Sequence, residues 1–160
     1  IARSCSLDIS ETSRIKDMLG LLSLYFDKPL ILINSHLDKQ TKQMVCGYAL
    51  GHYLEHQLLM DLHTLNKFLT IKDKHILLYE HNAFTSHLML DSDEVYQMTK
   101  RGLDAAQISA AKRIHLNLVL VKLLELHHLG YDLRHYHAQH HALIKQFNLP
   151  AHFQFDVAAG

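Results

Sequence analysis

The sequence is poor in three features that often define a class of protein: cysteine, net charge and long apolar runs. Its 160 residues contain 2 cysteines, Cys5 and Cys46, which excludes a disulfide-stapled fold and fits a reducing compartment. The 16 basic and 16 acidic residues balance, which argues against a cationic surface built for nucleic acid or anionic membrane. No apolar run approaches the roughly twenty residues of a membrane span. We therefore expect a cytoplasmic protein with no direct contact to DNA or membrane.

The remaining composition is that of an ordinary globular chain, with 48% hydrophobic and 20% charged residues. Its length is sufficient for one domain with a buried core, and we expect residues 1–160 to form a single domain. The pattern predicts an α+β fold, mostly helical, with a small sheet over about residues 5–35.

Two apolar runs within that region, residues 20–26 and 29–34, predict a β-hairpin, because each is short and a polar pair separates them. A helix over residues 11–26 is the alternative for the first run. A short strand is expected at residues 6–9, followed by a polar turn at 14–17.

The rest of the chain has mainly helical patterning. The expected helices cover about residues 38–57, 73–90, 93–102, 104–113, 116–128 and 134–147, the last four forming a helical C-terminal region over about 93–148. Asp38 is a suitable N-cap for the first of them, and Gly102 is a suitable residue to follow the third. Residues 58–73 lack a clear period and predict a loop, with one extended piece near 68–71.

The helix over residues 45–56 carries the most informative pattern. Positions 48, 52 and 56 are four residues apart and so lie on one helix face. A zinc peptidase places His-Glu-x-x-His on such a face: two imidazoles hold the metal and the Glu moves the proton. In this frame the second histidine is His52, but Tyr48 replaces the first and Ala49 replaces the glutamate. The pattern indicates a metallopeptidase site without its catalytic groups.

Three segments, in this order, resemble the ImmA/IrrE family of zinc peptidase-like proteins. They are Ile-Leu-Ile-Asn at residues 31–34, Leu-Gly-His at 50–52 and Glu-His-Asn-Ala-Phe at 80–84. The corresponding family patterns are Ile-Leu-Ile-Asn, His-Glu-Leu-Gly-His and Glu-Ala-Asn-x-Phe-Ala-x-x-Leu-Leu. The likeness spans about residues 18–131. It implies that His52 is a zinc ligand and Glu80 the third ligand of the family's site.

The resemblance also implies a function, repressor cleavage, and the missing groups imply that this chain lacks the catalytic activity. Members of the family cleave helix-turn-helix repressors of phages and mobile elements. A site with two of three protein ligands is short of the usual catalytic geometry, and a missing general base costs about 10²–10⁴-fold in rate. The expected protein is a degenerate metallopeptidase domain, a pseudo-enzyme that regulates a helix-turn-helix repressor by binding it in a phage or mobile-element switch. Zinc is expected to bind weakly or not at all.

The alternative is an active zinc endopeptidase that cleaves such a repressor with a substitute ligand, Tyr48 or His56. Residues 52–56 spell His-x-x-Glu-His, the inverted zinc motif, in which Glu55 would be the base. This arrangement moves the metal one helical turn away from Glu80. A phenolate ligand is also costly, since a phenol ionises near pH 10.

Three further patterns carry less weight. His137 and His141 have the spacing of an adventitious metal pair on a helix, but the favoured interpretation is a polar helix face. Cys46 is interpreted as a small core residue rather than a nucleophile. Residues 103–124 resemble a helix-turn-helix, but its second helix offers only Lys122 as a cation and is apolar nearly all round. We therefore expect that helix to be buried.

Overall fold

The computed structural model describes residues 7–16, 18–26, 28–56 and 76–133. Its elements in chain order are β1 (Asp8–Thr12), β2 (Gly20–Tyr25), β3 (Lys28–Asn34), α1 (Lys39–His56), α2 (Ile76–Met89), α3 (Ser92–Lys100), α4 (Ala105–Lys112) and α5 (Leu116–His128). The described chain is thus a small three-stranded sheet followed by five helices. This confirms the α+β, mostly helical fold. None of the described helices is both long enough and apolar enough to cross a membrane.

The sheet has the strand order β1-β3-β2, with β1 parallel and β2 antiparallel to β3. The predicted hairpin is confirmed, and the alternative helix over residues 11–26 is wrong. Burial explains the outcome: Leu22, Ile31 and Ile33 are at most 4% exposed and line one face, which is the two-residue period of a strand. The first strand begins at Asp8, later than expected, and extends to Thr12.

Side-chain caps define the helix ends, largely where the sequence places them. Asp38 accepts from the backbone N–H groups of Gln40 and Thr41 at 2.9 and 3.0 Å, so α1 begins at Lys39. Asp91 and Asp104 cap α3 and α4 in the same way. Gly102 and Gly130 follow α3 and α5 with φ values of 85° and 87°, the left-handed conformation that glycine adopts without strain.

The predicted helix over 134–147, the loop over 58–73 and its extended piece near 68–71 lie outside the described residues, as do His137 and His141. The predicted N-terminal turn of α2 from residue 73 is also outside them, and the described helix begins at Ile76.

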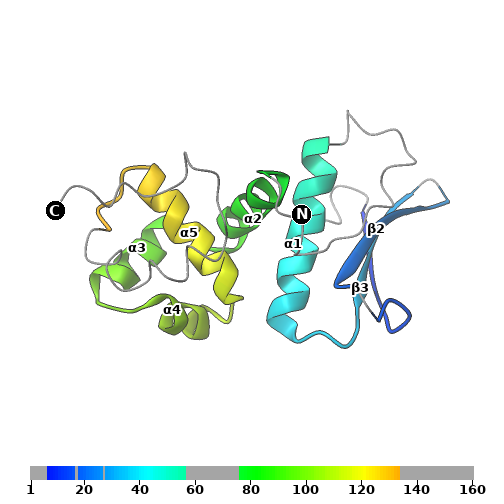
Figure 1. The fold of residues 1–160 in the computed structure, drawn as a ribbon, viewed down its shortest axis with the longest axis horizontal. Helices are drawn as coiled ribbons and strands as arrows, with labels where there is room; N and C mark the ends of the chain where they lie inside the picture. The colour runs from blue at the N-terminus through cyan, green and yellow to red at the C-terminus, as the bar shows by residue number, and fades with distance from the viewer. Residues whose placement is uncertain (1–6, 17, 27, 57–75, 134–160) are drawn as a thin grey trace.

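Two apolar clusters flank the middle of the molecule. One lies between the sheet and α1 and includes Leu22, Ile31 and Ala49. The other is formed by α3, α4 and α5 and includes Val95, Ile108, Leu118 and Leu126. Figure 1 shows α1 between the sheet and α2, with α2 between α1 and α5. The central helix α2 therefore connects the two halves.

Candidate functional site between α1 and α2

Two glycines let α1 and α2 approach closely. A Cβ at position 47 would lie 2.4 Å from Thr85 Cγ2, and one at position 51 would lie 2.8 Å from Phe84 Cδ1. Both distances are far below van der Waals contact, so a larger residue at either position would force the facing side chain or the helices to shift. Gly47 and Gly51 thus fix the distance between α1 and α2, and with it the space available to the residues between them.

Three rings meet between the helices, two from α1 and one from α2. His81 packs edge-to-face against Tyr48 and against His52, with ring centroids 4.9 Å apart in each case. His81 is 0% exposed, whereas Tyr48 and His52 are half-buried. The face of α1 that the motif reserves for metal ligands is therefore covered by a packed imidazole from α2.

The other predicted positions have different surroundings. Ala49, at the general-base position, is 0% exposed and belongs to the apolar cluster between α1 and the sheet. Glu80, the predicted third ligand, is exposed, and it is the next residue, His81, that contacts the α1 rings. Glu55 and His56 are the last two residues of α1, and their side chains lie outside the described part of the structure.

Whether a catalytic zinc fits between α1 and α2 depends on which side chains there can act as metal ligands. Among the described residues, no three side chains of His, Cys, Asp or Glu lie close enough together to hold a metal ion. A catalytic zinc needs three protein ligands and a water. The described residues at this place supply two imidazoles, His52 and His81, and the phenol of Tyr48, which do not fit that requirement. The roles of His52, Glu80 and His56 as ligands remain predictions.

Sequence reasoning missed His81, although a signal was present. His81 stands where the family pattern Glu-Ala-Asn has alanine, so a large ring replaces a methyl group. It also precedes Thr85 by four residues, and Thr85 is the residue that packs on Gly47. Residues at this spacing share a helix face, which places His81 toward α1.

The buried hydroxyls of α2 are satisfied within the helix. Thr85 and Ser86 are both 0% exposed. The Thr85 hydroxyl donates to the His81 carbonyl at 2.6 Å, and the Ser86 hydroxyl donates to the Ala83 carbonyl at 2.8 Å. Because these bonds are internal to α2, the tight contact with α1 carries little penalty for buried hydroxyls.

The asparagine of the Ile-Leu-Ile-Asn strand has a structural role. Asn34 is 4% exposed, and its side-chain amide donates to the carbonyls of Ile15 and Met18 at 3.1 and 2.9 Å. Its side-chain oxygen accepts from the N–H of His36 at 3.0 Å. Asn34 therefore ties the connection between β1 and β2 to the end of β3.

Two of the weaker sequence patterns can now be placed. Burial raises the pKa of the Cys46 thiol, which disfavours the thiolate and agrees with a core residue. Lys122, the one Lys or Arg within α5, is 1% exposed. The predicted burial of this helix is confirmed, and α5 has no Lys or Arg to offer to a DNA backbone.

A comparison with protein-family models covers both helices of the candidate site. Residues 10–124 match the family model described as the IrrE N-terminal-like domain. The match runs from within β1 to within α5 and includes both helices of the candidate site. Searches of curated proteins and of solved structures gave no significant match.

Proposed function

Because the chain belongs to the IrrE N-terminal-like family, the ImmA/IrrE family of metallopeptidase-like domains, we propose that it binds a helix-turn-helix repressor without cutting it. The setting is a phage or mobile-element switch. The proposal rests on one observation: His81 fills the space beside Tyr48 and His52, the α1 positions at which the family binds its metal.

The residues at this place support the proposed absence of hydrolysis. Peptide cleavage by this route needs a polarised water and a base that takes its proton. The base position is the methyl group of Ala49, which is 0% exposed. A missing base alone slows such reactions by about 10²–10⁴-fold. His52 and Glu80, with His56 as a substitute, stay the predicted zinc ligands, and we expect weak binding because the complete set of three is missing.

A domain of this kind can still hold a peptide. β1 and β2 are the two edge strands of the sheet, and residues 8–11 of β1 are exposed. An edge strand presents unpaired backbone N–H and C=O groups, to which an extended segment can add as a further strand. We assign the repressor segment to such an edge, where backbone hydrogen bonds hold it without any metal.

The test uses a helix-turn-helix repressor from the phage or mobile element that carries this chain. Calorimetry should detect association between the two full-length proteins, and the intact mass of the repressor should be unchanged after incubation with added Zn²⁺. Absence of any association would remove the proposal. Cleavage that a chelator abolishes would instead support an active zinc endopeptidase with Tyr48 or His56 as substitute ligand.

A further inference from the structure

The sheet buries its α1 side unevenly from one edge to the other. The strand register aligns three apolar side chains in a row across that side: Ile9 of β1, Ile31 of β3 and Leu22 of β2. Ile31 and Leu22 belong to the apolar cluster shared with α1 and are 0% and 1% exposed, whereas Ile9 is 45% exposed. The apolar layer between the sheet and α1 is therefore closed at β2 and open at β1.

An ion pair confirms which side of β1 faces α1. Glu11 is aligned with Ile33, which is 4% exposed, and its Oε2 lies 2.7 Å from Nζ of Lys42 on α1. Because side chains alternate along a strand, Ile9 lies on the same side as Glu11. The Lys42 and Glu11 side chains are 23% and 54% exposed, so this contact lies at the margin between α1 and solvent. Ile9 is thus a core-facing position at the open border of the layer.

The backbone of β1 directs hydrogen-bonding groups outward at the same two residues. In a parallel pair, one residue directs both its N–H and its C=O to the neighbouring strand, and the next residue directs both away from it. The Thr12 carbonyl accepts from the Ser35 N–H at 2.9 Å, directly after β3, so Thr12 faces β3. Ser10 therefore faces β3 as well. The N–H and C=O groups of Ile9 and Glu11 are directed to the outer edge.

The chemistry of this edge selects the strand that can add to it. Among the described residues, no strand other than β3 pairs with β1, and that pairing continues residue for residue without a bulge. β1 contains no proline or lysine, two residues that commonly block an edge, and its charged residues, Asp8 and Glu11, are both acidic. Like charges facing each other across strands are destabilising, which disfavours a second copy of β1. A segment that carries basic residues is favoured instead.

We propose that the repressor binds at the outer edge of β1, where an extended repressor segment adds as a fourth strand. The segment places an apolar side chain beside Ile9 and basic side chains beside Asp8 and Glu11. Its backbone bonds to the outward groups of Ile9 and Glu11, and its apolar residue completes the layer that ends at β1. This inference rests on the proposed function and names the edge and the chemistry of the bound segment. At the β2 edge, by contrast, Gly20 and Leu22 are already buried.

Calorimetry of the full chain with the repressor proposed as its partner tests this edge by two substitutions at one position. Ile9→Ala removes the apolar contact and keeps the outward N–H, whereas Ile9→Pro also removes that N–H and leaves the bonds between β1 and β3 in place. Ile9→Pro should bind at least about fivefold more weakly than Ile9→Ala, the effect of one lost hydrogen bond. Equal binding by the two variants, with binding by the unmodified chain, would refute the β1 edge and leave the proposed function standing. No binding by the unmodified chain would remove both.

A measurement on the unmodified chain keeps the test independent of how the proline variant folds. Amide hydrogen exchange of the free chain, followed by NMR, should be fast at Ile9 and Glu11 and slow at Ser10, whose N–H faces β3. Bound repressor should slow exchange at Ile9 and Glu11 by at least about tenfold. Unchanged exchange at these two amides in the complex would overturn the proposal. Slow exchange at Ile9 in the free chain would also overturn it, because another segment would then hold the edge.

Discussion

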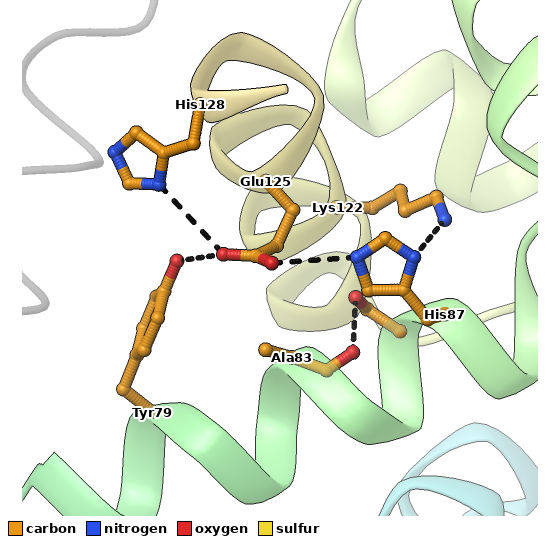
Figure 2. Close-up of polar contacts among 7 residues, drawn as sticks. Tyr79, Ala83, His87, Lys122, Glu125 and His128 are labelled. Atoms are coloured by element: carbon orange, nitrogen blue, oxygen red, sulfur yellow. Dashed lines mark hydrogen bonds and ion pairs between the residues drawn. The ribbon is translucent and has the colours of Figure 1, made fainter.

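The two faces of α2 dock on their neighbours by different physical means. Toward α1 the contact depends on shape: His81 and Thr85 are 0% exposed, and Gly47 admits Thr85 to close range. Toward α5 the contact also includes polar and charged groups, with His87 between Lys122 and Glu125 (Figure 2). The first face should respond to changes in side-chain volume, and the second to removal of a hydrogen-bonding group.

The largest expected effect on stability comes from removing the imidazole of His81, and removing that of His87 is the comparison. His81→Ala should lower the free energy of unfolding by about 2–4 kcal/mol, because it leaves a cavity between helices that two glycines hold close together. His87→Ala should cost about 1 kcal/mol or less at pH 7.5, because water can replace a half-exposed ring. Urea denaturation of both variants measures the difference. Equal losses would mean that the two faces do not differ in this way.

The contrast between His81 and Glu80 also shows how far sequence reasoning reached. The hairpin, the Asp38 cap and the α5 helix depend on local patterns, and all were predicted from them. The identity of the residue facing α1 was not. Neighbouring residues on a helix differ by about 100° in direction. Which of them faces α1 is set by the contacts of Gly47 and Gly51 with the next helix, and periodicity alone does not specify those.

The charged network was missed for a related reason. Lys122 lies in a helix with an apolar sequence pattern. The residues around it in the sequence do not indicate a contact with His87, which lies 35 residues away. Sequence correctly predicted the burial of the α5 helix but could not say which group would accept a proton from its one ammonium. Partners brought together only by tertiary packing need coordinates.

A methyl group at position 47 should produce the next largest effect. Gly47→Ala overpacks the contact with Thr85, at a cost of about 1–3 kcal/mol, while the helix itself gains up to about 1 kcal/mol. We expect a net loss of about 1–2 kcal/mol in urea denaturation. A more stable variant would show that α1 and α2 are less tightly packed than the 2.4 Å distance implies.

A smaller effect is expected at the centre of the charged face. Lys122→Met replaces a buried ammonium by an apolar chain of similar length, which is often neutral or stabilising, so unfolding at pH 7.5 should change by less than about 1 kcal/mol. A loss of several kcal/mol would indicate that the ion contacts, rather than apolar packing, hold α5 in place.

The smallest effect concerns a histidine remote from the α2–α5 contact. His115 caps α5 by accepting from the Asn117 N–H at 3.2 Å, and burial lowers its pKa from 6.5, against a raising effect of Asp38. A lowered pKa means that its stabilisation is present above pH 6.5 and is lost as the pH falls below that value. His115→Asn keeps a capping acceptor that does not titrate. In this variant the free energy of unfolding should fall less between pH 7.5 and 5.5 than in the unmodified chain, by a difference of less than about 1 kcal/mol. A larger fall in the variant than in the unmodified chain would contradict this assignment.

The most direct test of the central claim is the fate of a bound repressor. The full chain is mixed with the helix-turn-helix repressor proposed as its partner and Zn²⁺, the complex is isolated by size exclusion, and the repressor's intact mass is measured over time. We predict a stable complex that contains only full-length repressor. Repressor fragments that accumulate with zinc and disappear with chelator would contradict the account, because the packed ring of His81 would then not prevent the chemistry.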